Sequence, residues 1–83
     1  MSYIISDRKK YVARAYRTYT ARDYIMPLRH EYGGRVTASS ALVYDAIEEA
    51  QAYIKRNREF LDEFIPEARV LKYDVCCNCV LAR

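Results

Sequence analysis

The strongest local signal in the chain lies in Ser40-Ala-Leu-Val-Tyr-Asp45-Ala-Ile-Glu-Glu-Ala-Gln-Ala-Tyr-Ile54. Its apolar start, Ala41–Tyr44, predicts a short strand that leads directly into a helix. Asp45 is predicted to be the N-cap of that helix, because its carboxylate can accept a hydrogen bond from a backbone N–H of the first turn. Glu48 completes a D-x-x-E version of the capping box, and Glu48 and Glu49 both lie where the helix dipole favours negative charge.

The helix is predicted to continue as far as Ile65. Its apolar residues recur with a helical period along one side: Ile47, Ala50, Ile54, Leu61, Phe64 and Ile65, with Tyr53 and Phe60 beside them. The opposite side is charged. Pro66 cannot extend a helix and disfavours helical geometry at Ile65, so the helix ends there. Asn57 is a poor former of helix interiors and indicates a kink.

The chain before the helix indicates further strands. Tyr3–Ser6 and Lys10–Tyr16 flank the polar tetrad Asp7-Arg-Lys-Lys10, which is typical of a β-hairpin, and the second strand has a candidate extension through residues 17–20. Residues 21–39 leave two interpretations open. They form either a second hairpin, Tyr24–Tyr32 with Arg35–Thr37 around Gly33-Gly34, or an insertion loop.

Two further features, Pro27 and the segment after the helix, affect the predicted order of strands. Pro27 cannot donate to a central ladder, so it fits only an edge strand or an irregular segment. Arg69–Val75 is predicted to form the last strand, and its continuation through the cysteines to Leu81 remains open.

This order, β-β-(β)-β-α-β, predicts a single α+β domain over residues 1–83. The sheet would be small, antiparallel or mixed, with four or five strands, and one amphipathic helix would pack on one of its faces. The strands on either side of the helix would lie parallel through a right-handed crossover. The core is expected to be a single layer between the sheet and the helix.

Composition limits the location and chemistry that we expect. No apolar run approaches the length of a membrane span, and the first residues lack the pattern of a signal peptide, so a cytoplasmic protein without a membrane partner is expected. The single histidine, His30, has no nucleophile at a recognisable spacing. We therefore expect a protein that is not an enzyme and that uses no cofactor.

The three cysteines, Cys76, Cys77 and Cys79, crowd into four positions. An odd number in a chain of this kind indicates reduced thiols rather than a disulfide framework. Adjacent cysteines on a strand point to opposite faces, whereas structural zinc sites pair thiolates as C-x2-C, so a packing role is expected and no metal site is predicted.

A basic and aromatic run provides the best candidate binding surface. Residues 1–38 hold eight Lys/Arg and three acidic residues, a net charge of +5, whereas residues 39–83 hold six and eight, a net charge of −2. Cations that contact phosphates and tyrosine rings that stack on bases are the means by which sheets bind single strands. The candidate residues are Lys9, Lys10, Arg14, Tyr16, Arg17, Tyr19, Arg22, Arg29 and Arg35.

Three segments, Tyr3–Ala13, Ala41–Arg56 and Ala68–Val75, resemble small accessory proteins of bacteriophages and prophages. These proteins begin with a Tyr/Ile hairpin and continue with a strand, an Asp-x-x-Glu-Glu-Ala-x-x-Tyr-Ile unit and a final strand. The resemblance implies an inhibitor, as in anti-CRISPR and other counter-defence proteins, that occludes or sequesters a host protein or nucleoprotein complex in the host cytoplasm. The alternative is a module that binds nucleic acid or a nucleotide through the basic run around residues 9–22.

One helix cannot cover both faces of a sheet, so an uncovered face is expected. The strand residues available for that face are Tyr11, Tyr16, Tyr19, Tyr44, Tyr73, Val43 and Val75. Tyrosine suits an interface because it combines a large apolar ring with a polar tip. A homodimer, or a larger symmetric assembly, is therefore predicted through this face or an edge strand.

Overall fold

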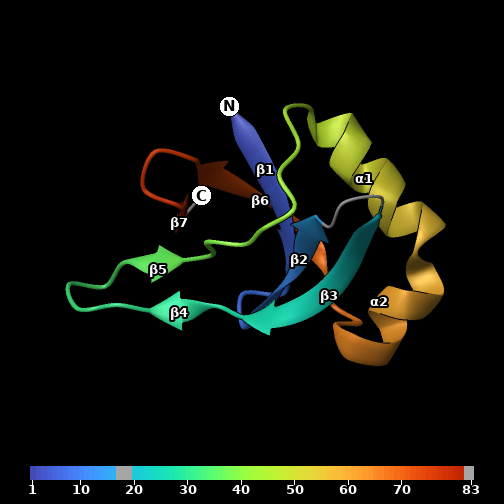
Figure 1. The fold of residues 1–83 in the computed structure, drawn as a ribbon, viewed down its shortest axis with the longest axis horizontal. Coiled ribbons are helices and arrows are strands. Elements are labelled where there is room, and N and C mark those ends of the chain that lie inside the picture. Colours follow the sequence, from blue (N-terminus) through green and yellow to red (C-terminus); the bar gives the residue numbers. More distant parts are fainter. Residues whose placement is uncertain (17–19, 82–83) are drawn as a thin grey trace.

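A computed structural model describes residues 1–16 and 20–81, and the side chain of Tyr16 is not described. The elements of the described chain are β1 (Ser2–Ser6), β2 (Lys10–Tyr16), β3 (Ala21–Pro27), β4 (Arg29–His30), β5 (Val36–Thr37), α1 (Ile47–Arg56), α2 (Arg58–Phe64), β6 (Arg69–Asp74) and β7 (Cys79–Val80) (Figure 1). The α+β class is confirmed. The described sheet has seven strands, which is more than the four or five predicted.

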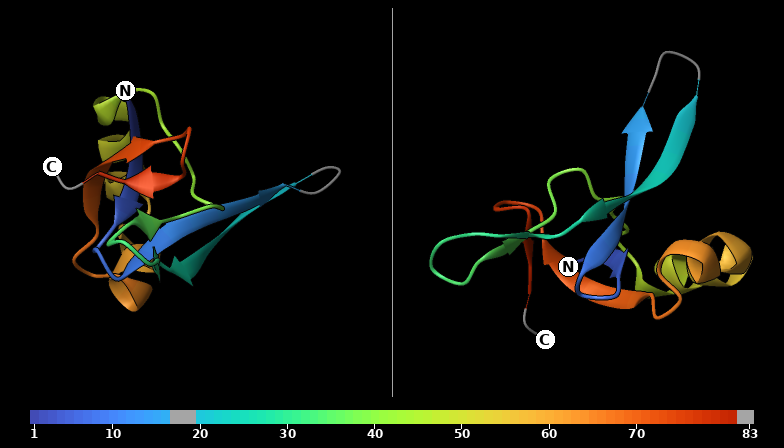
Figure 2. Two further views of the ribbon diagram at one scale, coloured as in Figure 1. Left: turned by 90° about the vertical axis from the view of Figure 1, so that its left-hand side faces the viewer. Right: turned by 90° about the horizontal axis from the view of Figure 1, so that it is seen from below.

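The sheet curls because its two ends are joined to each other. Its strands lie in the order β3-β2-β1-β6-β7-β5-β4, and each pair of neighbouring strands is antiparallel. β3 and β4 stand at opposite ends of this order, yet only Leu28 separates them along the chain. The sheet therefore bends round into a half-barrel, and β2 and β3 project from it as an arm (Figure 2). The segments on either side of the helix were predicted to lie parallel. Tyr44 and β6 both pair antiparallel with β1, so they run in the same direction, but β1 lies between them.

The predicted strand Ala41–Tyr44 is also wrong, and the reason lies in how β1 and β2 separate. These two strands pair directly at Ser6 and Tyr11, next to their turn. Further along, the segment 40–44 lies against both of them: the Leu42 N–H donates to the Val12 carbonyl (3.0 Å), and the N–H and C=O groups of Tyr44 and Tyr3 bond reciprocally. The segment crosses from one strand to the other, so it forms two isolated bridges rather than a ladder.

Both predicted hairpin turns are confirmed. Asp7 Oδ1 accepts hydrogen bonds from the backbone N–H groups of Lys9 (2.9 Å) and Lys10 (2.8 Å), which closes the β1–β2 turn. Gly33 and Gly34, with φ of 89° and 82°, form the turn between β4 and β5, so residues 21–39 are not an insertion loop. The predicted arm Tyr24–Tyr32 is wrong as one strand, because it divides at Leu28 into β3, which pairs with β2, and β4, which pairs with β5. Pro27 ends the edge strand β3, as expected. The candidate extension of β2 through residues 17–19 lies outside the described residues.

The helix starts one residue later than predicted and is divided in two. Ala46 is the N-cap of α1 and no side chain caps it, so the predicted role of Asp45 is wrong. Tyr44 is held to Tyr3, and the chain bends through residues 45 and 46 before the helix can begin. The break predicted at Asn57 is present, and α2 ends at Phe64 before Pro66.

The last segment is a hairpin rather than one strand that continues to Leu81. Asp74 Oδ1 accepts a hydrogen bond from the Cys76 N–H (2.9 Å), and Asn78 adopts a positive φ of 54°. Asx turns and left-handed asparagines are both typical of tight turns. They reverse the chain over residues 75–78, so that β7 pairs back onto β6.

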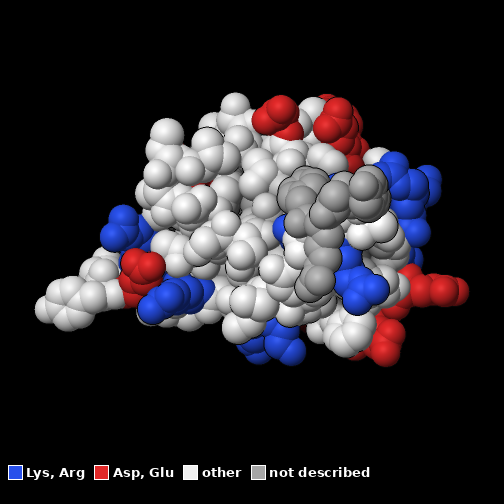
Figure 3. Space-filling model, viewed as in Figure 1, with Lys and Arg blue, Asp and Glu red and all other residues white. Residues whose placement is uncertain are grey.

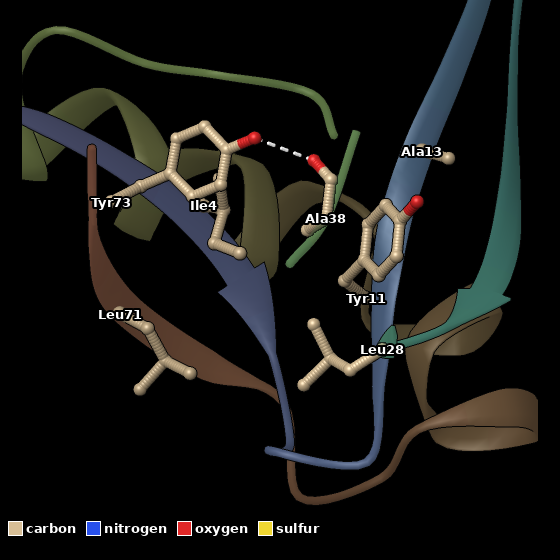
Figure 4. Packing of buried hydrophobic residues seen from close by; sticks show 7 residues of the cluster. All are labelled: Ile4, Tyr11, Ala13, Leu28, Ala38, Leu71 and Tyr73. Atoms are coloured by element: carbon tan, nitrogen blue, oxygen red, sulfur yellow. Dashed lines mark hydrogen bonds between the residues drawn. The ribbon is translucent and has the colours of Figure 1, made fainter. Parts of the chain in front are cut away.

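Because the sheet curls, it has two cores instead of the single layer that we expected. One core lies between the sheet and the helices and contains Ile5, Val12, Leu42, Ala50, Tyr53, Leu61 and Ile65. The other lies inside the curl and contains Ile4, Tyr11, Ala13, Leu28, Ala38, Leu71 and Tyr73, with the Tyr73 hydroxyl donating to the Ala38 carbonyl (Figure 4). Tyr11 and Tyr73, which were expected on an uncovered face, are buried here. The predicted uncovered sheet face is therefore wrong for these two residues.

Candidate functional site

The described residues of the predicted basic and aromatic surface come from several separate elements of the structure. Lys9 and Lys10 lie at the β1–β2 turn, Arg14 on β2, Arg22 on β3, Arg29 on β4, and Arg35 after the glycine turn, while Arg17 and Tyr19 lie outside the described residues and the side chain of Tyr16 is not described. On the face seen in Figure 3, basic side chains are spread over several places, with acidic side chains among them. Their role in binding stays a prediction.

Arg14 is held by an ion pair within the fold. Its Nε and a terminal nitrogen bond to the two oxygens of Asp23, at 2.6 and 3.1 Å, from the directly opposite position on β3. The Tyr53 hydroxyl of α1 donates to the same carboxylate at 2.6 Å. These three side chains, which we call the Asp23 network, tie the arm to the helix.

The Asp23 network shifts the pKa values of its members. The hydrogen bond from Arg14, assisted by that from Tyr53, holds the pKa of Asp23 below its usual value despite partial desolvation. Burial, and then the hydrogen bond to Asp23, raise the pKa of Tyr53. Asp23 is therefore anionic and Tyr53 neutral at physiological pH.

Arg35 also has a partner. It lies 3.8 Å from Glu31 across the glycine turn, and Glu31 accepts a hydrogen bond from the Thr37 hydroxyl at 3.3 Å. Tyr11, near the start of the basic run, is buried inside the curl. Cations and stacking rings from this run therefore do not alternate along one described surface.

Cys76 and Cys77 lie in the β6–β7 turn, and Cys79 is the first residue of β7. Cys77 and Cys79 are joined by a disulfide, so the expectation of reduced thiols is wrong for this pair, and Cys76 is a free, exposed cysteine. Across residues 1–16 and 20–81, the structure contains no group of three or more His, Cys, Asp or Glu side chains arranged to hold a metal ion. His30 is exposed on β4.

An apolar groove lies where α2 meets the edge strand β3. Its volume is about 410 Å³, and it is lined by Lys10, Asp23, Tyr24, Ile25, Pro27, Phe60 and Phe64. We call it the β3–α2 groove. Phe60 and Phe64 stand one helical turn apart with ring centroids 5.4 Å apart, and 48% of Phe64 is exposed.

The strand register explains why this groove is apolar. Pro27, Ile25 and Asp23 oppose Lys10, Val12 and Arg14, so these six residues lie on the helix side of β2 and β3. Asp23 is already paired with Arg14, which leaves Lys10 as the charged group at the end of the groove. Among the described residues, Lys10 has no ion pair within 4 Å.

The sequence contained part of the signal for this groove. Phe60 and Phe64 were assigned to the buried helical stripe, and the break at Asn57 was recognised. That break changes the direction of the stripe, so Leu61 and Ile65 face the core while Phe64 is half exposed. The position of α2 against β3 depends on the curl of the sheet. The sequence pattern did not predict this curl, so it did not predict the groove.

Comparison of the chain with protein-family models, with curated proteins and with solved structures finds no match. Within the described residues, no helix has the length and apolar character needed to cross a membrane.

Proposed function

We propose that this protein is a non-enzymatic binding module that occludes or sequesters a protein partner. The observation that carries the proposal is the half-exposed Phe64, in ring contact with the partly buried Phe60, beside an edge strand. Exposed aromatic side chains in a concave, mostly apolar site are typical anchors of protein interfaces.

The expected occupant is an extended segment of the partner. An edge strand offers unpaired backbone groups to which a peptide can add as a further strand, and side-chain pockets then select alternate residues. Pro27 has no N–H, so it would limit such pairing at one end of β3. Apolar side chains of the segment would contact Phe60 and Phe64, and an acidic side chain would pair with Lys10.

The resemblance to phage and prophage accessory proteins suggests the nature of this partner. We propose that it is a host component, such as a defence protein or nucleoprotein complex, that loses its function when the segment is covered. The resemblance includes β1, the start of β2, α1 and β6, which form the support of the groove rather than its aromatic lining.

Nucleic-acid binding is the second candidate. It is favoured by three consecutive exposed cations, Arg8, Lys9 and Lys10, in the β1–β2 turn. It is disfavoured by the involvement of Arg14 and Arg35 in ion pairs. Binding through such cations would weaken steeply as salt rises, because each neutralised phosphate releases counterions.

The test is affinity capture from host lysate with three tagged proteins: the wild type, Phe64→Ser and Ile47→Ser. Ile47 is the matched control, because it is an exposed apolar helix residue (38%) that does not line the groove. We expect the wild type and Ile47→Ser to retain the same protein partner after nuclease treatment, and Phe64→Ser to lose it.

Two outcomes would contradict the proposal. Capture that disappears after nuclease treatment would favour nucleic-acid binding. Capture that Phe64→Ser leaves unchanged would exclude the β3–α2 groove as the binding surface. Thermal unfolding of all three proteins checks that the substitutions leave the fold intact.

A further inference from the structure

A second hollow lies at one end of the half-barrel, beside the β1–β2 turn. Its volume is about 300 Å³, and it is lined by Arg8, Leu28, His30, Gly34, Val36, Val80 and Leu81. We call it the mouth hollow. It shares no lining residue with the β3–α2 groove.

Three parts of the chain that are distant in sequence meet at the mouth hollow. The Leu28 N–H donates to the Lys9 carbonyl at 2.9 Å, which holds the β1–β2 turn against the junction of β3 and β4. His30 and Val36 are directly paired across β4 and β5. β7, which carries Val80, pairs with β5 on its other side.

The floor of the mouth hollow is apolar. Leu28 belongs to the core inside the curl, and Val36 and Val80 are partly buried against that core. Gly34 leaves space at the rim, since a Cβ added there would have no atom within 4 Å. Apolar pockets at the mouths of barrels are typical sites for small ligands, and ligand pockets have volumes of roughly 300–1,000 Å³.

The rim of the mouth hollow is basic. Its polar side chains are Arg8 and His30, and none of its lining residues is acidic. The nearest carboxylates along the chain have other partners: Asp7 binds the backbone N–H groups of Lys9 and Lys10, and Glu31 binds Arg35 and Thr37. Arg8 has a positive φ of 74° and belongs to the β1–β2 turn, which places its side chain at the rim.

We propose that the mouth hollow binds a small amphipathic carboxylate, with its short aliphatic or aromatic tail on Leu28, Val36 and Val80. The carboxylate would bond to the Arg8 guanidinium and the His30 imidazole at the rim. Guanidinium groups match carboxylates in geometry and form charge-assisted hydrogen bonds. The limited volume selects a ligand of roughly one ring or a short chain.

Octanoate is a suitable probe, with octanol as its uncharged counterpart. The full-length ¹⁵N-labelled protein is titrated with each, and amide chemical shifts are followed by NMR. We expect saturable octanoate shifts at Leu28, Gly34 and Val80 that are much weaker with octanol. Loss of the charge-assisted bond in Arg8→Gln should weaken octanoate binding roughly tenfold.

Lys9→Gln is the matched control, because Lys9 is an exposed cation of the same turn that does not line the hollow. It should change the affinity less than twofold. Val36→Phe, which fills the hollow, should abolish binding, so the test does not depend on Arg8→Gln alone. The dispersion of the amide spectrum shows whether each variant is folded.

Three results would overturn the proposal: equal binding of octanoate and octanol, equal affinity of Arg8→Gln and Lys9→Gln, or shifts centred on Ile25, Phe60 and Phe64. Phe64→Ser should leave octanoate binding unchanged. A result that contradicts ligand binding at the mouth hollow can therefore be told apart from one that contradicts partner binding at the β3–α2 groove.

Discussion

Asp23 connects β3 to β2 and to α1 through a single carboxylate. The carboxylate receives two hydrogen bonds from Arg14 and one from Tyr53, and 21% of the Asp23 side chain is exposed. Hydrogen bonds to charged groups contribute more than neutral ones, and loss of one partner leaves the others unsatisfied. The Asp23 network therefore holds β3 to β2 and to α1. Because Asp23 also lines the β3–α2 groove, the network stabilises that wall of the groove.

Asp23→Asn should lower the free energy of unfolding by about 1–3 kcal/mol at neutral pH, and Tyr53→Phe by about 1 kcal/mol. Tyr32→Phe is the control, since Tyr32 is fully exposed and should have no effect. Urea unfolding measures all three. Equal stability of Asp23→Asn and the wild type would show that Asp23 does not connect the arm to the helix.

The same network predicts a pH dependence. The folded-state pKa of Asp23 is lowered, so its stabilising contribution is complete above its unfolded value of about 3.9 and is lost as the pH falls through the folded value. The difference in stability between the wild type and Asp23→Asn should therefore be constant from pH 5 to 7 and narrow below about pH 4. If the stability difference narrowed between pH 5 and 7 instead, the titrating group responsible for it would not be Asp23.

At the scale of the element, the β4–β5 hairpin depends on Gly33 and Gly34. Both have positive φ, and a Cβ at either position would contact nothing, so the cost of substitution comes from the backbone conformation alone. The Glu31 N–H donates to the Arg35 carbonyl at 2.7 Å and closes this turn. The hairpin forms one side of the mouth hollow, so its geometry affects that site.

Gly33→Ala should lower stability by about 1 kcal/mol and accelerate hydrogen exchange at the Glu31 amide. Gly33→Asn should cost less, because asparagine tolerates left-handed conformations better than alanine. Urea unfolding and amide exchange measure both effects. If Gly33→Ala and Gly33→Asn lowered stability by the same amount, the positive φ of Gly33 would not be the reason that the turn needs glycine.

At the scale of the whole molecule, the curl of the sheet provides two cores in a chain of 83 residues. β4, β5 and β7 fold over the face that was expected to be bare. The homodimer prediction therefore loses the part of its basis that rested on Tyr11 and Tyr73, whereas Val43 and Val75 remain exposed. The apolar side chains that remain exposed include Ile47 on α1 and Phe64 on α2, separate from the buried tyrosines.

We expect a monomer of 9.8 kDa, because Tyr11 and Tyr73 are covered within a single chain. Sedimentation across a hundredfold dilution should give one constant mass. A dimer that persists on dilution, and that Phe64→Ser dissociates, would make a second copy of the chain the occupant of the β3–α2 groove.

The sequence by itself determined the local features of this protein. Asp7 and Gly33-Gly34 predicted the turns, Asn57 the helix break and Pro66 the helix end, because each acts through its own backbone conformation or hydrogen bonds within a few residues. The α+β class follows from the alternation of such segments.

Only the tertiary structure decided how these segments meet. The joining of the two sheet ends at Leu28, the placement of residues 40–44 between β1 and β2, and the Asp23 network all depend on contacts between distant residues. The same applies to Asp45, whose local sequence favours an N-cap, because the bonds between Tyr44 and Tyr3 fix where the chain turns into α1. Both candidate sites lie at such junctions, where strand register and curl, rather than local residue preference, determine which side chains meet.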